Sequence, residues 1–213
     1  MFLLNVFHNK RNDYERIPPH LLSSRNQDIV EHLRENYCDV LIMDITSDIG
    51  VPVINVYALL DEKLAISGQG CSLSFDYAVE RALLECKQGV LVTPREVVEE
   101  QVENLANDAR SANIMFYQHA FTYDPSFFSG NPLATAKSIG KYDRLQAYKD
   151  VGRQLSFVEN RLSRMGYSIF YHERFADETC LHWVKTLIPG LEDFGLPGHV
   201  LIPSARGKAT MAI

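Results

Sequence analysis

The stretch "SGQGCSLSFDYAVERALLECKQ", residues 67–88, decides the fold, because it joins a run of small and polar residues to an amphipathic helix. With a rotation of about 100° per residue from Tyr77 onward, small and apolar side chains gather on one face of that helix. These side chains are Ala78, Val79, Ala82, Leu83 and Cys86. Glu80 and Lys87 fall on the opposite face and are expected in water. The pattern therefore predicts a helix over 75–88 that buries a face of small residues.

Arg81, Glu85 and Gln88 form a third sector of this helix, beside the apolar face. Glu85 is a neighbour of Gln88 at i,i+3 and of Arg81 at i,i+4. A partly sheltered carboxylate next to an amide suits a hard cation such as Mg²⁺, which takes oxygen ligands. The competing interpretation is a surface ion pair between Arg81 and Glu85, worth only a few tenths of a kcal/mol. Spacing alone favours the ion pair.

Gly68-Gln69-Gly70, just before the helix, is interpreted as a turn. A glycine-rich turn at a helix N-terminus can cradle a phosphate, but these residues match neither GxGxxG nor GxxxxGK[ST]. The motif by itself is a weak signal, since Gly-x-Gly before a helix is common.

The residues upstream alternate between helix and strand patterns. "QDIVEHLRENY" has helical spacing and predicts a helix near 27–37. "DVLIMDIT" predicts a strand near 39–46, and "DIGVPVINVYAL" predicts a glycine turn followed by a strand near 52–58. Together with the helix over 75–88, this order predicts an α/β or α+β fold.

The segment 94–150 is expected to hold a helix and a long loop excursion. "TPREVVEEQVENLANDAR" predicts a charged helix near 94–110 with Thr93 as its N-cap. "TYDPSFFSGNPLATAKSIGKYD" is rich in Pro, Gly, Ser and Asn and is typical of a loop. A further helix is predicted near 142–165, with Gly166 at its C-terminal end.

Two more strands are predicted near the C-terminus. "SIFYHERF" predicts a strand near 167–175 and "CLHWVKTLIP" one near 180–188, with "ADET" as the turn between them. All four predicted strands are expected in one mixed β-sheet packed with helices. No spacing indicates a Cys–His or Ser–His–Asp arrangement, so the catalytic residues are unassigned.

Composition excludes several classes of protein. The chain of 213 residues is long enough for one good-sized domain, and its net charge of −6 argues against binding to nucleic acid or an anionic membrane. No run of apolar residues approaches the ~20 that a membrane helix needs. The four cysteines show no CxxC or zinc-ligand spacing, which favours a reduced, cytoplasmic protein.

The order of three blocks resembles the C-terminal half of the YcaO family. The blocks are "LIMDITSDIGVPVINVYAL", "SGQGCSLSFDYAVERALLECKQ" and "LHWVKTLIPGLEDF". The matching positions are Asp44–Thr46, Gly50–Ile54, Gly68–Gly70, Ala78 to Gln88 and Ile188–Glu192. The similarity spans about residues 29–88 and 167–195, and the shared order is more specific than any one block.

The resemblance implies a chemistry. YcaO proteins bind ATP with Mg²⁺ and phosphorylate the oxygen of a peptide amide, after which a nucleophile attacks to give azolines, thioamides or amidines. It also implies that Glu85 and Gln88 are the family's Glu-x-x-Gln element, with Glu85 a Mg²⁺ ligand and Arg81 beside the nucleotide. The chain is then expected to be the C-terminal portion, 1–213, of a YcaO-like domain.

Two departures from the family pattern qualify this expectation. The other ATP-binding element, Ser-x-x-x-Glu followed by Glu-Arg, is absent, and Ser72-x-x-x-Asp76 stands at the wrong place for it. The tail "ARGKATMAI" is not the Pro-rich end of many peptide-cyclising members. ATP and Mg²⁺ are therefore not expected to bind tightly to this chain alone.

Alternatives to a catalytic role remain open. The chain could be a non-catalytic YcaO-like module that binds a partner or forms a homodimer, with "FYQHAFTYDPSFFSGNP" as a docking loop. It could also be an unrelated α/β domain. The partners expected of the enzyme are a peptide or protein substrate and a missing N-terminal half, supplied upstream or by a partner protein.

Overall fold

A four-stranded antiparallel sheet is the framework of this computed structural model, which describes residues 14–36, 39–59, 65–92, 96, 132–145, 150–176 and 181–191. The strands lie in chain order from β1 to β4, and each neighbouring pair is antiparallel. Their bounds are Glu15–Arg16 for β1, Asp39–Asp44 for β2, Val53–Leu59 for β3 and Ala65–Cys71 for β4. Strands that are consecutive in the chain are thus neighbours in the sheet, which is the common arrangement.

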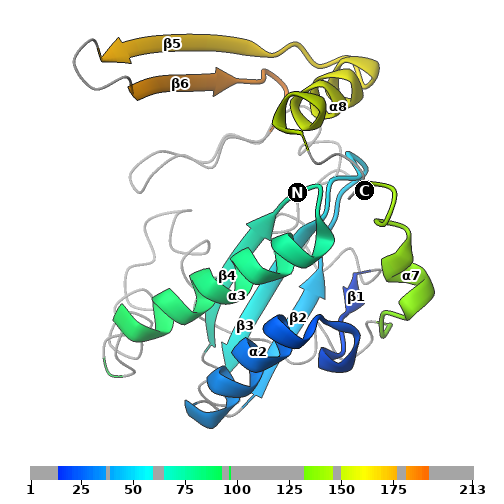
Figure 1. Cartoon of the computed structure of the whole chain (residues 1–213), viewed down its shortest axis with the longest axis vertical. Coiled ribbons are helices and arrows are strands. Elements are labelled where there is room, and N and C mark those ends of the chain that lie inside the picture. The colour runs from blue at the N-terminus through cyan, green and yellow to red at the C-terminus, as the bar shows by residue number, and fades with distance from the viewer. Residues whose placement is uncertain are drawn as a thin grey trace, which may run out of the picture.

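Two helices cover one face of this sheet (Figure 1). They are α2, Ser24–Asn36, and α3, Phe75–Val92, and a short 3-10 helix, η1, Pro19–Leu21, precedes α2. Because side chains alternate along a strand, every second residue of β3 points at the helices. Ile54, Val56 and Ala58 are fully buried there. The opposite face holds a second apolar cluster, which consists of Tyr14, Met43, Ile45, Tyr57 and Ala65.

Further elements follow the sheet along the chain (Figure 1). They are α7, Ala136–Gly140; α8, Val151–Arg164; β5, Phe170–Ala176; and β6, Leu181–Leu187. Among the described strands, β5 and β6 pair only with each other, as a separate antiparallel sheet. Figure 1 shows this hairpin and α8 together, beyond one end of the four-stranded sheet.

The predicted fold class, helices packed on a β-sheet, is confirmed. The helix expected near 75–88 forms as α3, and the strands expected near 39–46 and 52–58 form as β2 and β3. The large sheet is antiparallel throughout its described strands rather than mixed. β2, β3 and β4 follow one another closely along the chain, which favours antiparallel pairing, whereas η1 and α2 lie between β1 and β2. The strands expected near 167–175 and 180–188 form, but outside that sheet.

The region before α8 differs from the expectation in two places. The helix predicted near 142–165 begins only at Val151, because the Asp150 side chain accepts the N–H of Arg153 at 3.0 Å and caps the helix. The stretch interpreted as a loop contains α7, which Thr135 and Ser138 start with a reciprocal capping box. Most of the helix predicted near 94–110 lies outside the described residues.

Gly68 and Gly70 lie inside β4, so the turn predicted at Gly68-Gln69-Gly70 is wrong. Both glycines face α3. A Cβ atom added to Gly68 would overlap main-chain atoms of Ala82 and Cys86, and one added to Gly70 would overlap the carbonyl oxygen of Ala78. The strand therefore uses glycine to let the helix backbone approach closely.

We predict that Gly68→Ala and Gly70→Ala each lower the free energy of unfolding by more than about 3 kcal/mol, because the new methyl group meets rigid main chain instead of a side chain that can move. Gly140→Ala is the matched control, since its nearest neighbour would be an ordinary contact at 3.7 Å. Urea unfolding of the three variants measures the effect. Equal stability of Gly68→Ala and Gly140→Ala would contradict the packing argument.

Candidate functional site

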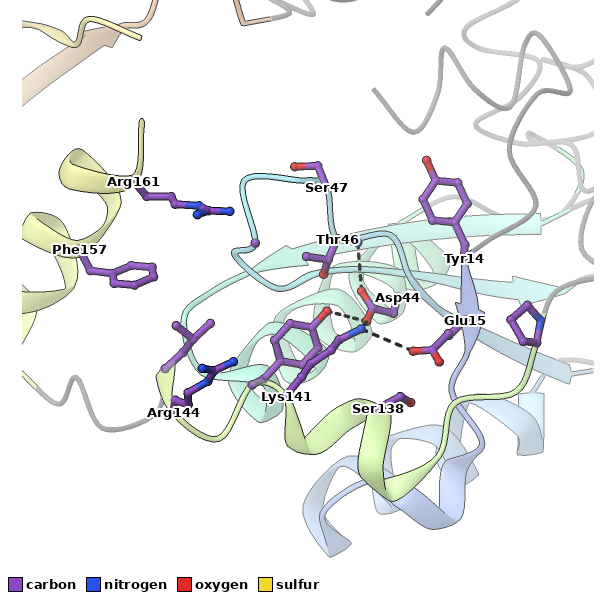
Figure 2. Close-up of a pocket in the computed structure, with 14 residues that line it drawn as sticks. Tyr14, Glu15, Asp44, Thr46, Ser47, Ser138, Lys141, Arg144, Phe157 and Arg161 are labelled. Atoms are coloured by element: carbon purple, nitrogen blue, oxygen red, sulfur yellow. Dashed lines mark hydrogen bonds and ion pairs between the residues drawn. The ribbon is translucent and has the colours of Figure 1, made fainter. Parts of the chain in front are cut away.

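Asp44, at the end of β2, is the centre of a buried polar network. The residue is 7% exposed. Its Oδ1 accepts the Thr46 N–H at 3.0 Å, and its Oδ2 accepts the Tyr142 hydroxyl at 2.7 Å. The ammonium group of Lys141 lies 3.2 Å from the same Oδ2 and 3.5 Å from Glu15 Oε2 (Figure 2). One carboxylate thus holds three donors, one from the adjoining loop and two from a segment about a hundred residues later in the chain.

Three elements bring this network together. Antiparallel pairing of β1 with β2 sets Glu15 opposite Asp44. The segment after α7 brings Tyr142 to Asp44, and the Tyr142 ring stacks on Phe75 at the start of α3, with ring centroids 5.3 Å apart. The Lys141 ammonium lies 4.8 Å from the centre of the Tyr142 ring, within cation–π range.

The environment of Asp44 keeps Lys141 and Tyr142 protonated. Burial, and then the negative charge of Asp44, raise the pKa of Tyr142 from 10.0 to about 12. Burial by itself lowers the pKa of Lys141, but the charge of Asp44 and contacts with Tyr142 outweigh it, and the net pKa is raised. At neutral pH Tyr142 is therefore a hydrogen-bond donor and Lys141 a cation.

A cavity of about 840 Å³ opens beside this network (Figure 2). It is bordered by the loop after β2, by the segment around α7 and by α8. Its lining comprises Tyr14, Glu15, Asp44, Thr46, Ser47, Gly50, Pro132, Ser138, Lys141, Tyr142, Arg144, Leu145, Phe157 and Arg161. The volume lies in the range of small-ligand sites.

Arg161 fastens α8 to the loop that borders the cavity. Its Nε donates to the carbonyl oxygen of Ile49 and its Nη2 to that of Asp48, each at 2.9 Å. Gly50 completes this turn with a φ of 78°, a value that glycine adopts without strain. The guanidinium group is therefore oriented by two neutral main-chain carbonyls.

The site residues predicted from the sequence lie outside this cavity, on helix α3. None of Arg81, Glu85 and Gln88 lines the cavity. All three are exposed on α3, and the Glu85 carboxylate accepts the Gln69 N–H of β4 at 2.7 Å. Among the described residues Arg81 and Glu85 form no ion pair, because Glu85 turns to the strand instead.

The position of Glu80 also differs from the expectation. It was expected in water, but its side chain is only 14% exposed and pairs with Arg25 of α2 at 2.6 Å. The pair joins the two helices that cover the sheet. Cys86 is buried as predicted, and burial raises the pKa of its thiol to about 12, so it is not a reactive thiolate.

The described residues do not by themselves form a complete metal site. No group of three or more His, Cys, Asp or Glu among them could hold a metal ion. Glu85 offers a carboxylate and Gln88 an amide, whereas Mg²⁺ requires six oxygen ligands in octahedral geometry. Any Mg²⁺ at Glu85 would need ligands from a nucleotide, from water or from residues outside the described part.

Sequence reasoning missed the groups that the cavity brings together. Asp44 and Thr46 were noted only as part of a strand pair, and Lys141 and Tyr142 stand in a stretch interpreted as loop. The Asp44–Tyr142 contact spans 98 positions. The stretch "GKYDR" gives no local signal for this contact, since its glycine and charged residues are common in solvated turns.

Comparisons with known proteins point to one family. The family model described as YcaO cyclodehydratase, ATP- and Mg²⁺-binding, matches residues 2–192. A solved heterocyclase in complex with substrate and cofactor is 17% identical, with a TM-score of 0.59 over 90% of this chain and 25% of its own. The heterocyclase TruD is 17% identical, with a TM-score of 0.60 over 96% of this chain and 26% of its own. The chain thus spans about a quarter of the length of these structures.

No curated protein matches the chain. Within the described residues no helix is both long and apolar enough to cross a membrane.

We predict that Tyr142→Phe lowers the free energy of unfolding by about 1–2 kcal/mol at neutral pH, because it removes a buried hydrogen bond to a charged acceptor. Tyr77→Phe, which removes a hydroxyl from a residue that is 51% exposed, is the control and should change little. Urea unfolding of both variants measures the difference. A loss no larger than that of Tyr77→Phe would show that the Asp44 network contributes no stability.

The pH dependence of the same variant tests the proton on Tyr142. Since the folded pKa is raised from 10.0 to about 12, the folded state binds more protons than the unfolded state between these values. The stabilising contribution of Tyr142 is complete below about pH 10 and is lost as pH rises to about 12. The stability gap between the wild type and Tyr142→Phe should therefore shrink over this window. A gap that stays constant would contradict the assignment.

Proposed function

The chain belongs to the YcaO cyclodehydratase family, and on that premise we propose that it is part of an ATP- and Mg²⁺-dependent enzyme that activates peptide amides by phosphorylation. The products would be heterocycles, thioamides or related backbone modifications. The observation that carries the proposal is the match of the family model over residues 2–192, which includes the helix that bears Glu85 and Gln88.

The geometry of α3 supports a binding role for Glu85. The helix lies directly on β4, because Gly68 and Gly70 leave no side chain between the strand and the helix backbone. The Gln69 N–H holds Oε2 of Glu85, and the side chain stays exposed at the edge of the sheet. A carboxylate oriented in this way by a rigid strand is suited to bind a cation.

In this proposal Glu85 would supply one ligand oxygen to Mg²⁺, and Arg81 and Gln88 would lie beside the phosphates. When bound, ATP with Mg²⁺ supplies the phosphoryl group that activates the amide oxygen. The remaining ligands and the substrate-binding surface would come from the rest of a complete protein, since the solved heterocyclases are about four times as long.

A non-catalytic role is the second candidate. The described residues hold too few oxygen ligands for a complete Mg²⁺ site, and exposed apolar side chains lie on the hairpin. These are Phe170, Tyr171, Val184 and Leu187. Under this alternative the chain would bind a partner protein or a second copy without using ATP.

We predict that the 213-residue chain alone binds MgATP weakly or not at all, because a single helix offers too few ligand oxygens. Calorimetric titration of the chain with MgATP measures the affinity directly. Micromolar binding would show that the chain holds a complete nucleotide site.

We predict that Glu85→Gln abolishes ATP-dependent modification of a peptide by the assembled protein, because a ligand charge at Mg²⁺ is lost. Stability should change by less than about 1 kcal/mol, since Gln can still accept the Gln69 N–H at this exposed position. Glu31→Gln, which neutralises an exposed carboxylate on α2, is the control. Phosphate release and peptide mass are measured together. Full activity of Glu85→Gln would end the metal-ligand assignment, and modification without ATP consumption would contradict the proposed reaction.

A further inference from the structure

The cavity beside Asp44 carries more positive than negative charge. Its described lining contains the cations Lys141, Arg144 and Arg161 and the carboxylates Glu15 and Asp44. One positive charge is therefore left over. Lys141 is already close to both carboxylates, at 3.5 and 3.2 Å, so the unbalanced charge belongs to the two arginines.

Arg161 is held in place without being neutralised. Among the described residues its guanidinium donates hydrogen bonds to the carbonyl oxygens of Asp48 and Ile49, which bear no net charge. A guanidinium group whose orientation is set in advance loses little conformational entropy when it binds an anion. Within the part of the chain that the structure describes, these two bonds leave other N–H groups of Arg161 for a ligand.

Arg144 supplies a second guanidinium group to the same cavity. It stands in the exposed segment after α7 and, among the described residues, has neither an ion pair nor a hydrogen bond. Figure 2 shows the side chains of Arg144 and Arg161 on either side of Phe157, both directed toward the space in front of Asp44. Two such groups can grip the oxygens of one oxyanion.

The rest of the lining discriminates between oxyanions. A leftover charge of one matches a carboxylate, whereas the multiple charges of a nucleotide phosphate chain would be repelled by Glu15 and Asp44. Apolar surface from Leu145 and Phe157 lies next to the arginines and suits the hydrocarbon part of a ligand.

We propose that this cavity binds a carboxylate side chain of the peptide substrate, gripped by Arg144 and Arg161, with Leu145 and Phe157 against its methylene groups. The inference rests on the proposed function in so far as the ligand is a peptide. The cavity would then favour substrates with Glu or Asp near the modified position, and it would be separate from the nucleotide-binding helix α3.

The test is an NMR titration of the 213-residue chain without nucleotide or Mg²⁺, observing the arginine Nε–H signals. The probes are N-acetyl-glutamate N-methylamide and its glutamine counterpart, which differ in the charge of the side chain. Inorganic phosphate is titrated in parallel. The glutamate probe should shift the Arg144 and Arg161 signals in a saturable way, and the glutamine probe should not.

Two variants assign the binding to the cavity. Arg144→Gln should weaken binding of the glutamate probe about tenfold, in line with the loss of hydrogen bonds to a charged group. Lys137→Gln removes a nearby exposed charge of α7 that does not line the cavity, and it should change binding less than about twofold. Arg144→Gln is expected to fold, because Arg144 is exposed and, among the described residues, makes no hydrogen bond or ion pair that the change would remove.

Each other outcome overturns the inference. Equal shifts with both probes would exclude a carboxylate site, and tighter binding of phosphate would assign the cavity to a phosphate ligand. Unchanged affinity in Arg144→Gln would remove that residue from the site. Since no nucleotide is present, these results are independent of the MgATP and Glu85 experiments, which test the proposed reaction.

Discussion

Helix α3 lies on strand β4 only because two residues of that strand have no side chain. Gly68 and Gly70 face the helix, and a single Cβ at either one would overlap its main chain. The contact sets the height and register of α3 on the sheet, and small residues such as Ala78 and Ala82 complete it. The buried core then follows, since α3 and α2 together close one face of the sheet.

The same contact determines where the functional groups stand. Because α3 packs against β4, the Glu85 carboxylate accepts the Gln69 N–H. β4 is the edge strand of the described sheet, so this bond satisfies a main-chain donor that no described neighbouring strand pairs with. The N-terminal end of α3 places Phe75 under the ring of Tyr142, whose hydroxyl donates to Asp44. One rigid helix therefore supports two polar sites.

These two sites differ in charge and in construction. Around Glu85 an exposed carboxylate stands on a rigid helix and suits a cation. Around Asp44 a buried carboxylate is satisfied by Thr46, Lys141 and Tyr142, and the adjoining cavity keeps a surplus of positive charge. The reaction we propose uses a nucleotide and a peptide, which need separate binding places, and the charges of these two sites are consistent with that division.

The sequence by itself determined the local structure and the family. Helical spacing in residues 75–88 and the β-strand runs around it are local patterns, so they predicted α3, β2 and β3 and supported the resemblance to the YcaO family. Only the tertiary structure showed that Gly68 and Gly70 are strand residues. Glycine is needed at these positions because α3, which follows later in the chain, packs directly against them. The hydrogen-bond network of Asp44 with Tyr142 could not be predicted from the sequence either. Asp44 and Tyr142 are 98 positions apart, and their contact depends on tertiary packing, which a local sequence pattern does not predict.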